Sequence, residues 1–169
     1  MKSRQTRCSR AVGFTLIELI VVMVIIGILA AMAIPRVSRG TAGASETAVI
    51  NDLAVMRNAI ALFAEEHKGK FPPGPTGDDV ADQLVQHSDE AGTAVSLTRD
   101  STHRFGPYLV KVPRCSVVTG ANAADIAVDA TSPPATNLTG EGWVYNITTG
   151  EIIANSTATD TAGTAFNTY

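Results

Sequence analysis

Hydrophobic residues run almost without interruption from Phe14 to Ile34, and Thr15 and Glu18 are the clearly polar residues among these 21. As a helix, the run would be roughly 31 Å long, which matches the hydrocarbon core of a bilayer. Because apolar side chains occur on every face, such a helix requires lipid or protein all round it. We therefore predict a helix over residues 14–34 that crosses a membrane or is enclosed by protein. Glu18 is costly at membrane depth, by about 2.5–3.5 kcal/mol, and needs a polar partner.

Residues that weaken a helix follow the apolar run, beginning with Pro35. Proline in a helix interior removes a hydrogen bond and bends the axis. Gly40 and Gly43 follow, and each glycine weakens a helix relative to alanine. We expect residues 35–45 to be a hinge or a melted segment.

A second helical pattern follows, with apolar positions alternately four and three residues apart. This stripe consists of Val49, Leu53, Met56, Ile60, Phe63 and His67. Its spacing predicts an amphipathic helix, and Gly69 followed by Pro72-Pro73 is typical of a helix end. We predict a kinked amphipathic helix over residues 35–69 whose stripe packs on a sheet. A short coiled coil is the alternative.

Residues 70–169 are expected to form a small β-rich head. Its clearest strand signal is a hairpin in which Gly142–Ile147 and Glu151–Ala154 are joined by a Thr-Thr-Gly turn. Trp143, the single tryptophan, is expected to anchor the sheet against the long helix. A short helix is expected from Asp78, as its cap, to about His87, with Val80 and Leu84 facing inward. The segments 89–104 and 119–140 are expected to be loops, and 115–118 a short strand. The tail, residues 155–169, is expected to be loose or to contact another subunit.

The predicted fold class is therefore α+β. One long N-terminal helix has a membrane half and an amphipathic half, and the amphipathic half packs on a small C-terminal antiparallel sheet.

Basic residues are concentrated before the apolar run. Residues 1–13 contain four of the 13 basic residues and no acidic residue, which leaves nine basic against 16 acidic residues and a net charge of −7 for the remainder. Positive residues preceding an apolar span stay in the cytoplasm, so the C-terminal part is expected to face outward. The acidic balance of that part gives no reason to expect a nucleic-acid partner.

The two cysteines are Cys8, before the apolar run, and Cys115. If the N-terminal segment is removed, Cys115 has no intrachain partner for a disulfide. We expect it to be a small buried hydrophobic residue. A cross-link between subunits is the alternative.

The stretch Gly13-Phe14-Thr15-Leu16-Ile17-Glu18-Leu19, with the apolar run and Pro35 after it, resembles the class III signal of type IV pilins and type II secretion pseudopilins. The resemblance is specific over residues 13–35. It implies removal of a leader, residues 1–13, by a peptidase that cuts between Gly13 and Phe14, and N-methylation of Phe14. It also makes Glu18 the family's assembly glutamate, Pro35 its kink proline, and the fold type IV pilin-like.

The charges near the proposed cut are consistent with an assembly role for Glu18. Cutting after Gly13 creates a positive amine at Phe14, and Glu18 lies about 6 Å further along the helix axis. Glu18 is expected to pair with its own amine or with the amine of a neighbouring copy, and a pair between copies would set the register of an apolar filament core.

A second reading of the N-terminus remains open. Ala31-Met32-Ala33 has the small-residue pattern of an ordinary secretory cleavage site. Cleavage after Ala33 would release a soluble secreted binding protein that begins at Ile34.

No catalytic pattern is visible in the sequence. The three histidines lack metal-ligand spacing and there is no phosphate-binding glycine loop, so we do not expect an enzyme. Some major pseudopilins bind calcium in a C-terminal loop, which makes Asp125, Asp129 and Glu141 weak calcium candidates, although they do not form an EF-hand pattern. No other cofactor is expected.

The sequence therefore predicts a structural subunit of a type IV pilus-like filament, and in particular a type II secretion pseudopilin that polymerises as a helical homo-oligomer to drive export. By resemblance, its partners are a prepilin peptidase and methylase, an inner-membrane platform protein, an assembly ATPase and minor pilins. It is expected to cross the inner membrane once, with its C-terminal part in the periplasm, and to enter a periplasmic or extracellular filament after assembly. The alternatives are a surface or minor adhesive pilin and the secreted binding protein.

Overall fold

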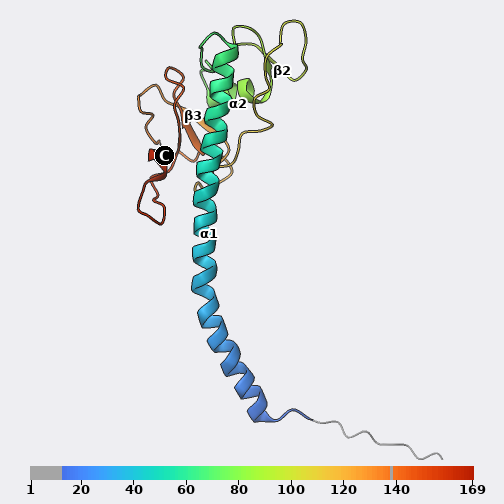
Figure 1. Ribbon diagram of the computed structural model, residues 1–169, viewed down its shortest axis with the longest axis vertical. Coiled ribbons are helices and arrows are strands. Elements are labelled where there is room, and N and C mark those ends of the chain that lie inside the picture. Colours follow the sequence, from blue (N-terminus) through green and yellow to red (C-terminus); the bar gives the residue numbers. More distant parts are fainter. Residues whose placement is uncertain (1–12, 138) are drawn as a thin grey trace, which may run out of the picture. The chain divides into compact units, whose positions relative to one another are not determined.

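The computed structural model describes residues 13–137 and 139–169, apart from the side chains of residues 32–42. Figure 1 shows α1 (Leu16–Glu66), α2 (Gly77–Val85), β1 (His87–Ser88), β2 (Val95–Ser96), β3 (Ile126–Val128), β4 (Trp143–Tyr145), β5 (Ile152–Ala154) and the 3₁₀ helix η1 (Phe166–Thr168). The chain divides into an N-terminal unit, residues 1–40, and a head unit, residues 41–169. The predicted leader lies outside the described residues except for Gly13.

The backbone of α1 is helical without a break from Leu16 to Glu66. The melted alternative for residues 35–45 is therefore wrong for the single chain. The boundary between the two units nevertheless falls between Gly40 and Thr41, inside this segment. A bend at Pro35 and unwinding in a filament stay predictions.

The apolar stripe of α1 forms the core of the head unit, as predicted, and all six of its residues are buried. The five residues from Val49 to Phe63 pack in one cluster with Val80 and Leu84 of α2 and with Trp143, Tyr145 and Ile152 of the sheet. Burial of each large apolar side chain in this cluster stabilises the folded head by about 1.5–3 kcal/mol relative to an exposed side chain. His67 ends the stripe, and its Nδ1 lies 2.7 Å from the carbonyl oxygen of Phe63. The head of the same chain thus covers the stripe that a coiled coil would have used.

The main sheet has the strand order β3-β4-β5. β4 and β5 pair antiparallel, with Trp143 opposite Ala154, which confirms the predicted hairpin. Trp143 is fully buried, and its Nε1 donates to the carbonyl oxygen of Pro113 at 2.8 Å. β3 runs parallel to β4, so the sheet is mixed where a purely antiparallel one was predicted. The α+β fold class itself is confirmed.

Several local predictions for the head were wrong. Cys115–Val118 is a turn in which the amide of Val118 donates to Cys115, and the segments predicted as loops contain β2 and β3. The tail is not loose, because Phe166 is buried and the amide of Thr161 donates to Glu46 Oε1 at 2.8 Å. The tail therefore packs onto α1 within the head unit.

The second helix begins one residue earlier than its predicted cap. Thr76, and not Asp78, is the N-cap, and Thr76 and Asp79 form a reciprocal capping box. Val80 and Leu84 are buried, as predicted. Gly77 opens the helix against β3, and a Cβ at this position would lie 1.5 Å from the carbonyl oxygen of Ile126. Only glycine therefore allows α2 to approach the sheet this closely.

We expect Gly77→Ala to destabilise the head by about 1–3 kcal/mol, because either the helix or the strand must move. The matched control is Gly43→Ala in α1, where an added Cβ would meet no atom within 4 Å. Alanine in that helix should be neutral or stabilising, by up to about 1 kcal/mol. Denaturant unfolding of the detergent-solubilised full chain, followed by the fluorescence of Trp143, measures both. Equal midpoints for the two variants would contradict the close packing of α2 on β3.

Candidate functional site

The N-terminal unit holds the residues that the sequence singles out for processing and assembly. Gly13, Phe14 and Thr15 precede the helix and are exposed. A peptidase needs an accessible, non-helical segment, so this geometry is compatible with a cut between Gly13 and Phe14.

Thr15 and Glu18 cap the start of α1 reciprocally. The backbone amide and the hydroxyl of Thr15 each donate to Glu18 Oε2 at 2.9 Å. In return, the amide of Glu18 donates to Thr15 Oγ1 at 3.3 Å. This is a capping box, which satisfies amides that a helix N-terminus otherwise leaves without partners. The Thr-x-x-Glu spacing at residues 15–18 is the sequence signal of this capping box, which was not among the predictions.

The capping box leaves Glu18 with capacity for a further partner, since no described residue donates to its Oε1 atom. Its charge also suits the position, because a carboxylate in the first turn offsets the positive end of the helix dipole. A new amine at Phe14 would add a second positive charge immediately before the cap.

Glu18 borders an apolar groove on the surface of the unit. The groove has a volume of about 320 Å³ and is lined by Phe14, Ile17, Glu18, Val21 and Val22. Phe14 is 85% exposed, and the large apolar side chains from Leu16 to Leu29 are exposed on all sides of the helix. A single polar group thus lies beside a surface that water solvates poorly.

The remaining candidate residues are not brought together. Pro35 lies in the helical backbone of α1, and its side chain is outside the description. Asp129 accepts hydrogen bonds from Thr131 and from the amide of Ala135, and Glu141 accepts one from Thr139. In the part of the chain that the structure describes, no three acidic, histidine or cysteine side chains cluster as a metal site would require. Calcium binding at Asp125, Asp129 and Glu141 therefore gains no support from the geometry.

Comparisons with known proteins give one matching family model and several similar proteins. Residues 11–34 match the model of the prokaryotic N-terminal methylation motif. Similar proteins include the type IV narrow pilus major component PilA5 of Thermus thermophilus, 48% identical over 60 residues, which are 36% of this chain and 52% of that protein. The type II secretion system core protein G of Aeromonas hydrophila is 30% identical over 105 residues, or 62% of this chain and 66% of that protein. A fimbrial protein of Pseudomonas aeruginosa is 47% identical over 96 residues, or 53% and 62% of the two chains.

The chain carries the prokaryotic N-terminal methylation motif and is similar to type IV pilins and to type II secretion pseudopilins. It spans between about half and two thirds of the length of the relatives above, from 52% to 66%. No solved structure matches it. The motif ends at Ile34, one residue before Pro35 and at the end of the predicted apolar helix.

The pilin-like chain has two apolar helical segments among its described residues. Gly43–Glu66 has 24 residues and is long and apolar enough to cross a membrane, with a mean hydropathy of 1.3 over its most apolar 18 residues. The apolar segment that begins at Leu16 is described as far as Ala31. The first of these buries the core stripe against the head and carries Glu46, Asp52 and Arg57, which is typical of a packed amphipathic helix. The segment that begins at Leu16 lacks such a covered face and suits a membrane anchor better.

Cys115 is free and fully buried in the head core, as predicted for a small hydrophobic residue. Burial raises the pKa of its thiol, which makes the nucleophilic thiolate scarcer. Both observations argue against the cross-link between subunits.

Proposed function

We propose that this pilin-like chain is the structural subunit of a type II secretion pseudopilus, a filament that polymerises from the inner membrane and drives protein export. The observation that supports this most is the N-terminal helix, which exposes apolar side chains on every face and carries Glu18 beside an apolar groove. Packing such helices against one another exchanges lipid for protein, and repeated head-to-tail contacts give an open fibre.

The parts of the chain have the following proposed roles. Residues 1–13 are the leader, residues 14–34 the membrane and filament-core helix, residues 35–69 the kinked amphipathic helix, and residues 70–169 the periplasmic head. Before assembly the chain crosses the inner membrane once. A prepilin peptidase and methylase, a platform protein, a cytoplasmic ATPase and minor pilins complete the proposed machinery.

The pseudopilus role is preferred to a surface pilus on two grounds. The match to core protein G covers 105 residues, against 96 for the fimbrial protein and 60 for the narrow-pilus component. The chain without its leader also retains Cys115 alone and cannot form an intrachain disulfide. A surface pilin is the second candidate, and the 48% identity to a narrow-pilus component favours it.

The intact mass and N-terminal sequence of the protein from envelope fractions test the processing step. We expect a chain that begins at N-methylated Phe14. A chain that begins at Ile34 would instead show ordinary secretion and would overturn the filament proposal. Filaments that stay in the periplasm at normal expression would support the pseudopilus, and filaments on the cell surface would support the second candidate.

A further inference from the structure

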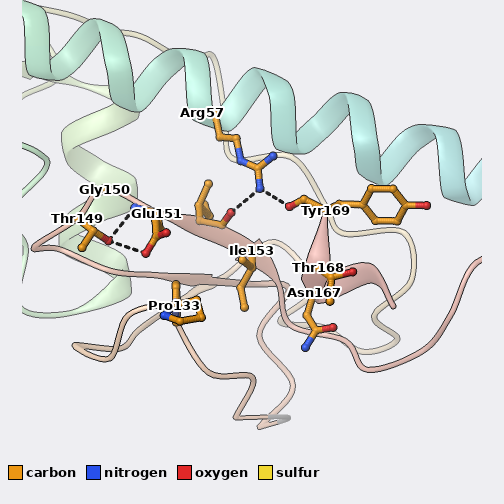
Figure 2. Close-up of a pocket in the computed structure, with 11 residues that line it drawn as sticks. Arg57, Pro133, Thr149, Gly150, Glu151, Ile153, Asn167, Thr168 and Tyr169 are labelled. Carbon is orange, nitrogen blue, oxygen red and sulfur yellow. Dashed lines mark hydrogen bonds between the residues drawn. The ribbon is translucent and has the colours of Figure 1, made fainter. Parts of the chain in front are cut away.

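A pocket on the head lies between α1, the edge of β5 and the tail. Its volume is about 630 Å³, and residues that line it include Arg57, Pro133, Pro134, Ile152, Ile153 and Tyr169. Figure 2 shows Ile153 between Pro133 and Asn167, with Arg57 reaching over from α1. The guanidinium of Arg57 donates to the carbonyl oxygens of Ile152 and Tyr169, which joins the three walls. The lining therefore includes the apolar side chains of two prolines and two isoleucines, and the hydrogen bonds of Arg57 hold its walls together.

Two polar groups at this pocket could bind a further partner. Glu151 is exposed and accepts hydrogen bonds from the hydroxyls of Thr149 and Ser132, each at 3.0 Å. Within residues 13–137 and 139–169 it forms no ion pair. Asn167 Oδ1 is buried and accepts no hydrogen bond from the described residues. An occupant with one apolar side chain, a positive charge and a donor would fit this lining.

The loop that follows β2 presents such a set of groups. Leu97 is 84% exposed, and Arg99 is exposed and belongs to no ion pair in the described part of the chain. An exposed leucine on a flexible loop would be a poor anchor for a partner, but the loop that carries Leu97 is held by hydrogen bonds.

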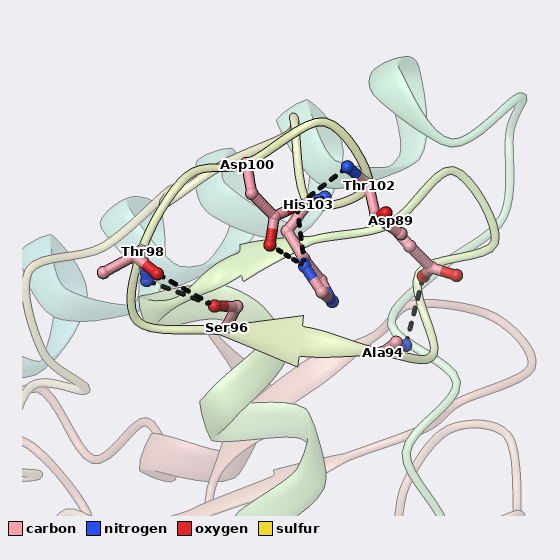
Figure 3. A network of polar contacts seen from close by, with 7 residues as sticks. All are labelled: Asp89, Ala94, Ser96, Thr98, Asp100, Thr102 and His103. Carbon is pink, nitrogen blue, oxygen red and sulfur yellow. Dashed lines mark hydrogen bonds and ion pairs between the residues drawn. The ribbon is translucent and has the colours of Figure 1, made fainter.

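Hydrogen bonds brace this loop, and Figure 3 shows those between Ser96 and Thr98 and those to Asp100. The amide of Thr98 donates to Ser96 Oγ at 3.2 Å, and Asp100 Oδ1 accepts from the amides of Thr102 and His103, each at 2.7 Å. His103 Nδ1 also lies 3.0 Å from Asp100 Oδ2. The hydrogen bonds from His103 and Thr102 lower the pKa of Asp100 to about 2, so its carboxylate stays charged at neutral pH. The loop is thus preorganised, which reduces the entropy lost when it binds.

The loop and the pocket lie on different sides of the head. In Figure 1, β2 is to the right of α1, whereas the C-terminal segment that lines the pocket is to the left. One chain cannot fill its own pocket in this arrangement. A second copy placed alongside can do so, and each added copy then offers a new free loop and a new free pocket. Such a contact is heterologous and generates an open array rather than a closed dimer.

We propose that Leu97 of one copy inserts into the pocket of the neighbouring copy, where Arg99 pairs with Glu151 of that neighbour. This inference deepens the proposed filament function and rests on it, because only an array of aligned heads repeats the contact. The helices of the N-terminal units would supply the common axis, and the heads would add a lateral, directional contact.

Disulfide trapping in the full chain tests this contact. Leu97→Cys and Thr168→Cys place thiols on the loop and at the pocket, while Cys115 stays buried. Under mild oxidation of envelope fractions, the double variant should give a ladder of cross-linked multimers. Each single variant should stay monomeric, and coexpression of the two single variants should give dimers only, since each chain then offers one reactive end.

The matched control pairs Thr168→Cys with Val110→Cys. Val110 is fully exposed and apolar like Leu97, but it follows Leu109, whose amide is bonded to α2. We expect about tenfold less cross-linking than with Leu97→Cys, because Val110 gains no buried pocket. Equal ladders from both pairs, or dimers from Leu97→Cys alone, would overturn the proposed insertion.

Microscopy of the same cells separates this inference from the filament proposal. Filaments without a ladder would refute the Leu97 contact and leave the proposed function standing. A ladder without filaments would support the contact and count against the filament. If neither forms, both proposals fail.

Discussion

A leucine in place of Gly13 is expected to leave the chain uncut, so that the precursor with its leader accumulates in the membrane. Gly13 lies in the exposed, non-helical start of the described chain, and a Cβ there would meet no atom within 4 Å. The substitution should therefore leave the fold unchanged and test whether the peptidase accepts a side chain at this position. Intact-mass analysis of the detergent-extracted protein measures the retention of the 13 leader residues.

The control for this prediction is Gly27→Ala. Gly27 lies inside the apolar part of α1, and an added Cβ would also meet no atom within 4 Å. This variant should be trimmed normally, since it lies well beyond the proposed cut. Normal trimming of Gly13→Leu would contradict a cut between Gly13 and Phe14.

The sequence predicts the long helix and the hairpin well because both depend on local patterns. The stripe from Val49 to His67 repeats over five turns, so the face buried by the head can be read from spacing alone. The strands on either side of the Thr-Thr-Gly turn are neighbours along the chain, and their pairing needs no distant partner.

The elements that were missed depend on distant partners. β3 has three residues, lies between Asp125 and Asp129, and pairs in parallel with β4 across a connection of 14 residues. Ile126 and Val128 are residue types that favour strands, but three residues within a long polar segment give a signal too short to recognise without the tertiary contact. The tail likewise appears polar and loose in sequence, yet Phe166 is buried and Thr161 and Tyr169 are hydrogen-bonded to side chains of α1.

The candidate site shows a related limit. Gly13, Phe14 and Glu18 could be identified from the sequence, because all three belong to the N-terminal motif and Glu18 is also a charged residue in an apolar run. The hydrogen bonds between Thr15 and Glu18 were not predicted, although the spacing of the two residues is typical of a capping box. The pocket beside Arg57 could not have been predicted, because it joins residues 95 and 112 positions apart in the chain.

The capping box also changes how Glu18 should be tested. Glu18→Ala removes both the carboxylate that caps the helix and the charge proposed to pair with a neighbouring Phe14 amine, so it cannot separate the two roles. Glu18→Gln can, because glutamine also serves in a capping box while carrying no charge. Loss of the cap alone costs about 1 kcal/mol, which is small beside the many apolar contacts of a filament core.

We expect both Glu18→Ala and Glu18→Gln to be cut after Gly13 and inserted in the membrane, and neither to form filaments. The reason is that the buried amine of a neighbouring copy would lose its counter-charge, and an unpaired buried charge costs several kcal/mol. Thr15→Val is the complementary variant, because it removes the hydroxyl that caps the helix and keeps the carboxylate; it should assemble with a modest loss. Filament counts by electron microscopy, with intact mass as the check on cleavage, measure all three. If Glu18→Gln assembles normally while Thr15→Val does not, the carboxylate acts as a helix cap, and the pairing between subunits is wrong.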